Sequence, residues 1–259
     1  MQFSVEILDH IFSFLVSSRE TLVALSKDPV LSSIVERHVY YQLIVHIGQP
    51  TFHSCSFEPD RLSKVVSKNP RILNYVRILQ IEIGIDRPSN PKMEEVQAIR
   101  TQLDEFAKTL HMFPVLECIT LTTSINREWY WSGAFRAALE GRLNLPTVKE
   151  VRLAGDSRFP SSLLDNRENI TNLSFSALTL VTEGQDLTKL PELQSLTLST
   201  HFMSSELLSW IKLHISDLKS LKYTYAAISG LWPLSEMLGV CSQTLKKLDI
   251  SLVDSKCKG

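Results

Sequence analysis

Apolar residues near the start of the chain recur at the spacing of an amphipathic helix. Ser4 precedes the segment and can accept a hydrogen bond as its N-cap, and Glu6 faces the positive end of the helix dipole. Periodicity alone favours docking on the chain's own domain, but Ile7 and Phe14 widen the apolar surface and indicate a partner. The stripe itself comprises Val5, Leu8, Ile11, Phe12 and Leu15.

Two further short helices are predicted in the next 25 residues or so. Residues 19–26 carry Leu22 and Leu25 on one face, and Asp28-Pro29 ends this helix. Three short helices in about forty residues bury too little surface to be stable alone, so they need the rest of the chain or another protein. The third helical stripe comprises Leu31, Ile34, Val35, Val39 and Tyr40.

From residue 71 onward one short pattern, apolar-x-x-apolar-x-apolar, returns along the chain. Copies beginning at positions 76, 116 and 148 lie 40 and 32 residues apart, and later copies follow at intervals of 22 to 27. Each copy predicts a short strand, and the copy at 218–223 also fits a second register at 221–225. The copies are Val76-Leu79-Ile81, Leu116-Ile119-Leu121, Val148-Val151-Leu153, Ile170-Leu173-Phe175, Leu193-Leu196-Leu198, Leu218-Leu221-Tyr223 and Leu245-Leu248-Ile250.

Amphipathic helical stripes separate these predicted strands, at residues 93–110, 129–139, 207–215 and 234–241. A strand that alternates with a helix at this period resembles a leucine-rich-repeat solenoid with a parallel sheet, over about residues 71–252. The alternative is an ordinary α/β domain whose strands share a pattern. No polar cap follows the last strand, which leaves the last helix, further chain or another protein to cover it.

The residues between the apolar anchors are expected to line the concave face of the sheet, where a target protein would bind. They are mostly small hydroxyl residues with few charges, so they predict a location rather than a ligand. The candidates are Gln80, Glu82, Thr120, Thr122, Arg152, Ala154, Ser174, Ser176, Thr197, Ser199, Asp249 and Ser251.

The N-terminal segment resembles an F-box, in the divergent F-box-like form frequent in fungal proteins. The matching stretches are residues 5–15, 22–26 and 36–40, with Phe3-Ser4 in place of the usual Leu-Pro and no Trp in the third helix. The resemblance implies a head that presses on a Skp-type adaptor, with Leu8 and Phe12 structural. The implied adaptor surface comprises Phe3, Val5, Ile7, Ile11, Phe14, Leu15 and Leu31.

The sequence therefore predicts an F-box-like head (1–48), a linker (49–70) with a helix at 60–68, and a degenerate leucine-rich-repeat domain (71–259). Together the resemblances imply the substrate-recognition subunit of an SCF-type (Skp–cullin–F-box) ubiquitin ligase. In that role the head reaches a cullin-RING ligase through the adaptor, and the repeats hold an unknown target. The alternative is a non-catalytic leucine-rich-repeat scaffold that does not engage a ligase.

The composition bears on the kind of partner and on the cellular compartment of the protein. A net charge of −1 on 259 residues argues against a nucleic-acid partner, and no apolar run is long enough to span a membrane. The N-terminus does not resemble a signal peptide, since Asp9 and His10 interrupt it. Scattered cysteines, with Cys118 and Cys241 expected to be buried, indicate a reducing compartment, the cytoplasm, the nucleus or both.

The sequence contains no recognisable catalytic or metal-binding motif. No nucleophile elbow, phosphate loop, metal-ligand spacing or paired acidic motif occurs, so we expect no enzyme activity, metal or cofactor. Gly155-Asp156-Ser157 is interpreted as a turn after a strand. The aromatic cluster Trp129-Tyr130-Trp131 is assigned to core packing, with a recognition anchor as the alternative.

Overall fold

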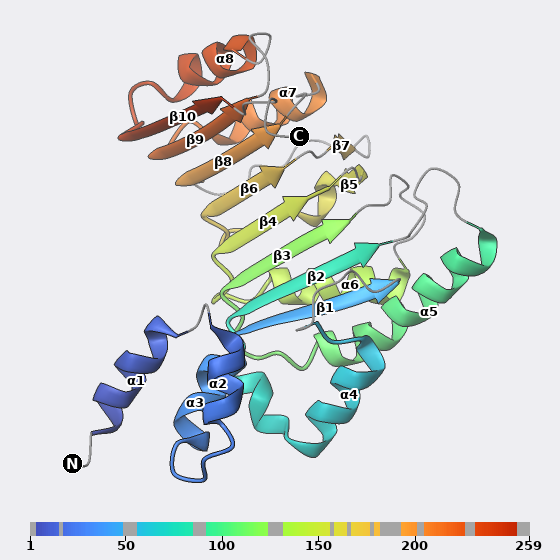
Figure 1. Ribbon diagram of the computed structural model, residues 1–259. Helices are drawn as coiled ribbons and strands as arrows, with labels where there is room; N and C mark the ends of the chain where they lie inside the picture. Colours follow the sequence, from blue (N-terminus) through green and yellow to red (C-terminus); the bar gives the residue numbers. More distant parts are fainter. Residues whose placement is uncertain are drawn as a thin grey trace, which may run out of the picture.

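The protein is an open, parallel α/β structure with a small helical head (Figure 1). The computed structural model describes residues 4–15, 18–48, 56–84, 92–123, 132–155, 158–164, 167–176, 179–181, 193–200, 205–225 and 231–252. Within these ranges the helices are α1 Val5–Phe14, α2 Arg19–Leu25, α3 Ser32–Val39, α4 Pro59–Lys68, α5 Met93–Leu110, α6 Gly133–Leu143, α7 Ser205–His214 and α8 Leu231–Cys241. Two short 3-10 turns lie at Pro70–Asn74 and Ser161–Leu163.

The main sheet has eight strands in the order β1-β2-β3-β4-β6-β8-β9-β10, and every neighbouring pair is parallel. Each strand of this sheet therefore lies beside the main-sheet strand that precedes it in the chain. Two short strands, β5 (Arg158–Pro160) and β7 (Thr179–Val181), pair separately. The main strands are β1 Gln42–Gly48, β2 Ile78–Gly84, β3 Cys118–Thr123, β4 Glu150–Ala154, β6 Asn172–Ser176, β8 Ser195–Thr200, β9 Ser220–Tyr225 and β10 Lys247–Leu252.

All seven predicted strands are confirmed. In each, the second and third apolar positions of the pattern lie in a strand, while the first lies just before it. The ambiguous copy is also settled, because Leu221 pairs with Leu196 and Tyr223 with Leu198. From β2 to β9 these paired apolar residues are almost fully buried, so the pattern marks the side chains that face the helices.

The strand β1 is the main element that the sequence analysis missed. It lies inside the range 1–48 assigned to the head, yet it pairs along its whole length with β2, from Gln42 beside Ile78 to Gly48 beside Gly84. The sheet therefore begins at residue 42. The helix predicted at 60–68 (α4) follows β1 and precedes β2 along the chain, so it belongs to the sheet domain. Tyr40, Leu43 and Val45 have the same apolar spacing as the later copies. They were not read as a strand because the F-box resemblance assigned this segment to the head.

The helices of the sheet domain follow one face of the sheet (Figure 1). The stripes predicted at 93–110, 207–215 and 234–241 correspond to α5, α7 and α8. The helix predicted at 129–139 corresponds to α6, which begins at Gly133 among the described residues and runs four residues further, to Leu143. Trp129-Tyr130-Trp131 lies outside the described residues. The inward side chains of these helices and the strand leucines form one continuous apolar core.

One backbone contact recurs at every step between adjacent strands of the main sheet. A carbonyl just before one strand accepts hydrogen bonds of 2.8–3.2 Å from two successive N–H groups at the start of the next strand. For example, the Tyr41 carbonyl accepts from Arg77 and Ile78. The same offset at each step means that the strands stack as equivalent units. The accepting carbonyls belong to Tyr41, Arg77, Glu117, Lys149, Thr171, Gln194 and Lys219.

Two polar side chains add to this stacking from the same position of their units, directly before the first apolar anchor. The Asn169 amide nitrogen lies 2.8–2.9 Å from the carbonyl oxygens of Leu143, Leu145 and Val148 in the preceding unit. The Thr244 hydroxyl donates to the Ser216 carbonyl in the unit before it, at 2.9 Å. Asn169 also begins a glycosylation sequon, but here its side chain has a structural role.

We expect Asn169→Ala to lower the free energy of unfolding by about 1–3 kcal/mol, because part-buried carbonyls lose their donor. Urea denaturation followed by circular dichroism measures this change. The matched control is Asn74→Ala, which removes an exposed amide that precedes an earlier strand. A loss for Asn169→Ala no larger than that of the control would contradict the stacking role.

The histidine at the end of α7 predicts a pH dependence of stability. His214 is buried beside Trp210, with ring centroids 4.7 Å apart, and burial lowers the pKa of its imidazole to about 4. The unfolded chain takes up this proton at a pKa near 6.5, so the stabilisation is complete above pH 6.5 and is lost as the pH falls toward 4. We expect a loss of about 2 kcal/mol between pH 7.5 and pH 5 from this group.

Denaturation midpoints measured at several pH values for the wild type and for His214→Gln test this expectation. The variant can be less stable at every pH, but its curve is expected to be flatter between pH 7.5 and pH 5. Parallel curves would show that His214 is not the titrating group.

Candidate protein-binding surfaces

The head is a three-helix unit with its own small core. Ser4 caps α1 as predicted, with its hydroxyl 3.5 Å from the Ile7 nitrogen. The second helix, α2, ends before Asp28-Pro29, where the Asp28 carboxylate accepts a hydrogen bond of 2.8 Å from the Val30 N–H. The buried residues of this core are Phe12, Leu22, Ile34, Val35 and Val39, with Leu8, Leu15, Leu25, Leu31 and Tyr40 packed against them.

A carboxylate on α1 fixes this helix to α3. Oδ1 of Asp9 lies 2.9 Å from Nε of Arg37 and 2.6 Å from Nε2 of His38. The His38 ring also meets the Phe12 ring edge-on, with centroids 6.1 Å apart. Polar and apolar contacts therefore hold one side of α1 against the head and define which side remains exposed.

The exposed side of α1 is strongly apolar. Val5 is 54% exposed, Ile7 49%, Ile11 42% and Phe14 71%. Ile7, Ile11 and Phe14 project within about 60° of one another around the helix, and we call these three residues the α1 face. Val5 is exposed on a different side of the first turn. The predicted stripe therefore splits, because Leu8 and Phe12 turn to the head core, as expected, while Ile11 faces outward.

The other candidates for the adaptor surface are placed differently. Leu15 and Leu31 are half-buried and pack on the head core, so they support the helices more than they extend the exposed surface. Phe3 lies outside the described residues. Sequence reasoning missed Val30, which is 79% exposed in the turn before α3. A valine directly after Asp28-Pro29 was the only sign of it.

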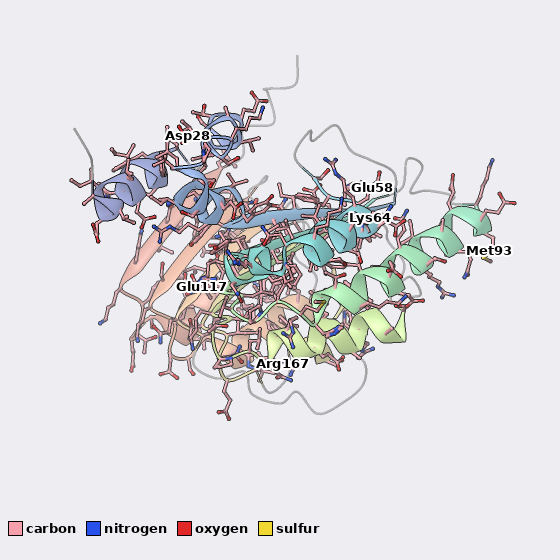
Figure 2. All side chains as sticks on the ribbon, turned by 90° about the horizontal axis from the view of Figure 1, so that it is seen from below. Asp28, Glu58, Lys64, Met93, Glu117 and Arg167 are labelled. Atoms are coloured by element: carbon pink, nitrogen blue, oxygen red, sulfur yellow. The ribbon has the colours of Figure 1, made fainter. Side chains whose placement is uncertain are left out.

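The head joins the sheet through a short connection. Only Tyr40 and Tyr41 separate the end of α3 from the start of β1. Tyr40 packs against both the head core and the sheet core, and the Tyr41 carbonyl accepts the first pair of inter-strand hydrogen bonds. Figure 2 shows the head, marked by Asp28, at one corner of the molecule and Met93 of α5 at the opposite side. The head is thus held by packing directly at the edge of the sheet.

The strand register gathers the predicted target-binding residues into two rows on the sheet face opposite the helices. The first row runs through Gln80, Thr120, Arg152, Ser174, Thr197, Lys222 and Asp249. The second row runs through Glu82, Thr122, Ala154, Ser176, Ser199, Thr224 and Ser251. We call this surface the open face.

The structure brings every predicted residue of the open face into these rows and adds Lys222 and Thr224, which the sequence analysis did not name. The register ambiguity at β9 had hidden them. Arg152, Lys222 and Asp249 are exposed, and the small hydroxyl residues between them are half-buried. Arg152 makes an ion pair of 2.7 Å with Glu150 on its own strand.

The β1–β2 end of the open face is occupied by internal contacts. Gln42 donates to Gln80 at 3.1 Å, Gln80 donates to Glu82 at 2.7 Å, and His46 lies 3.4 Å from the second oxygen of Glu82. His46 itself is buried. Gln80 and Glu82 are therefore tied into the sheet, and the more accessible part of the open face lies over β4 to β10.

In the described residues, no group of three or more His, Cys, Asp or Glu side chains is arranged to hold a metal ion. Cys118 and Cys241 are buried free thiols, as predicted, and burial raises the pKa of Cys118 to about 11. No described helix has the length and apolar character needed to cross a bilayer.

Comparison with known proteins leaves the chain without an assigned family. No protein-family model matches the sequence. No curated protein matches it significantly either. Function must therefore be argued from the two surfaces described above.

Proposed function

We propose that this protein is the substrate-recognition subunit of an SCF-type ubiquitin ligase, whose F-box-like head binds a Skp-type adaptor. The observation that carries the proposal is the α1 face, where three large apolar side chains stay exposed while Leu8, Asp9 and Phe12 of the same helix are packed or ion-paired. Exposed apolar side chains grouped on one ordered helix are typical of a protein interface. Val30, in the turn before α3, is a further exposed apolar side chain on the head.

We propose further that the sheet domain is an irregular leucine-rich-repeat solenoid that captures the target protein. Its strands follow one another in chain order, and the same carbonyl contact joins each unit to the next. The positions of Asn169 and Thr244 repeat in the same way. In such an arrangement the open face over β4 to β10 is the surface for the target, and its exposed charges come from Arg152, Lys222 and Asp249.

In this role the chain performs no chemistry, and its contribution is to position two proteins. The connection through Tyr40 and Tyr41 holds the head against the sheet, so an adaptor on the α1 face and a target on the open face would keep a defined geometry. A fixed geometry raises the effective concentration of the target near the ubiquitin-charged enzyme. A partner cullin-RING ligase would then be recruited through the adaptor alone.

Co-expression with a Skp-type adaptor tests the proposal. We expect a one-to-one complex on size-exclusion chromatography. Deleting residues 1–48 is an unsuitable control because it also removes β1, so head variants that keep the sheet intact are required. If the folded full-length chain does not bind any Skp-type adaptor, the proposal is wrong, and a leucine-rich-repeat scaffold without a ligase becomes the better assignment.

A further inference from the structure

The two edges of the main sheet differ in how they are covered. At the β1 edge, Phe57 adds a bridge: its N–H donates to the Ile44 carbonyl and its carbonyl accepts from the His46 N–H, both at 2.8 Å. At the β10 edge, no described residue pairs with the outer side of the strand. An unpaired edge strand presents free backbone donors and acceptors to another strand.

The helix-facing side of β10 is also exposed, whereas that of every other strand in the main sheet is buried. Leu248 and Ile250 are each 44% exposed and Leu252 is 60% exposed, whereas Leu221 and Tyr223 on β9 are at most 2% exposed. Figure 1 shows β10 as the last strand of the sheet, with α8 beside it. A backbone edge that no described residue pairs with and three exposed apolar side chains therefore coincide on one strand.

We propose that a second copy of this chain pairs with β10 in antiparallel orientation about a two-fold axis centred on Ile250. The proposal is independent of the ubiquitin-ligase function. A two-fold axis perpendicular to the sheet keeps helix-facing sides together, so Leu248 of one copy meets Leu252 of the other, and Ile250 meets its own counterpart. The apolar side chains of both strands would then form one shared strip between the two α8 helices.

The backbone N–H and C=O groups needed for this pairing are those that point away from β9. The Lys247 N–H donates toward β9, to the Lys219 carbonyl at 2.9 Å. Because backbone groups alternate along a strand, those of Leu248, Ile250 and Leu252 point away from β9, toward the side on which no described residue pairs with β10, and are in position to pair with the second copy. About six new backbone hydrogen bonds result, two for each residue pair.

Charge selects the centre of symmetry. With the axis on Ile250, Asp249 lies opposite Ser251 of the second copy. With the axis on Asp249, two carboxylates would lie directly opposite each other in the closely spaced type of pair, which is destabilising. The strand is therefore self-complementary in one register and repulsive in the adjacent one.

Sedimentation equilibrium of the full chain, from about 1 to about 200 µM, tests the dimer, since a single edge pairing buries little area and gives a weak complex. We expect a reversible dimer, and we expect Ile250→Lys to weaken it at least tenfold. Leu213→Lys is the matched control, because it removes an equally exposed leucine from α7 and is expected to leave the dimer unchanged. A monomer at all concentrations, or a dimer equally stable in Ile250→Lys, overturns the proposal.

Cysteine cross-linking tests the register separately. In a Cys55→Ser, Cys257→Ser background, Ile250→Cys is expected to form an intermolecular disulfide under mild oxidation, because directly paired α-carbons lie about 5.5 Å apart. Asp249→Cys is the control, since in this register it lies opposite Ser251 rather than its own counterpart. Cross-linking through position 249 in preference to 250 would overturn the assigned axis.

Discussion

The double substitution Ile7→Asp, Ile11→Asp is expected to abolish binding of a Skp-type adaptor while the protein stays folded. Both side chains are about half exposed and lie one helical turn apart on the α1 face, so they would stand near the centre of the interface. Placing two carboxylates there replaces apolar contacts with charges that lose water and gain no partner. We expect a loss of at least a hundredfold in affinity, measured by isothermal titration calorimetry.

A matched control distinguishes a lost interface from a damaged head. Val23→Asp places a carboxylate on α2 at a valine that is 42% exposed, outside the α1 face, and is expected to bind the adaptor normally. Circular dichroism melting of each variant should match that of the wild type, because neither isoleucine belongs to the head core. Retained adaptor binding by the folded double variant would show that α1 is not the binding surface.

The substitution Gly155→Ala is expected to destabilise the sheet domain by about 3 kcal/mol or more. Gly155 directly follows β4 and has a φ of 104°, a backbone conformation that residues with a side chain rarely adopt. An added Cβ would also collide with the carbonyl of Thr123 on β3. The Gly155 N–H donates to the Ser176 carbonyl at 3.0 Å, so this residue joins the ends of neighbouring strands and cannot move away without cost.

Gly141→Ala is the control for this prediction. Gly141 lies within α6, and a Cβ added there would have no neighbour within 4 Å. Alanine is favoured over glycine inside a helix, so this variant is expected to be more stable by about 0.5–1 kcal/mol. Urea denaturation of both variants measures the contrast. If Gly155→Ala unfolds at the wild-type midpoint, the turn after β4 accommodates a side chain and the prediction is wrong.

The sequence pattern predicted most of the strands because their apolar residues alternate locally. Leu79 and Ile81, or Leu196 and Leu198, become buried whenever a helix covers that side of the strand, and their spacing already shows this. The same applies to the long stripe of α5. By contrast, β1 was missed because seven residues assigned to one domain pair with a strand that lies 36 positions further along the chain.

The candidate sites were predicted less completely. The sequence identified Ile7 and Ile11 as outward-facing and Leu8 and Phe12 as structural, but it placed Leu15 and Leu31 on the adaptor surface, where the structure packs them against the head core. Likewise, the rows of the open face were expected, but the contacts of Gln80 with Gln42 and of Glu82 with His46 on β1 were not. Such contacts join side chains on different strands and leave no mark in the local pattern.

By itself, the sequence determined the class of the fold, the alternation of strand and helix, and the presence of surplus apolar residues on the first helix. These features follow from the local spacing of side chains, which sets the faces that an element must bury. Only the tertiary structure decided which of those faces remain exposed. Among the described residues, none packs over the α1 face or pairs with the outer edge of β10, and this arrangement depends on contacts between residues far apart in the chain.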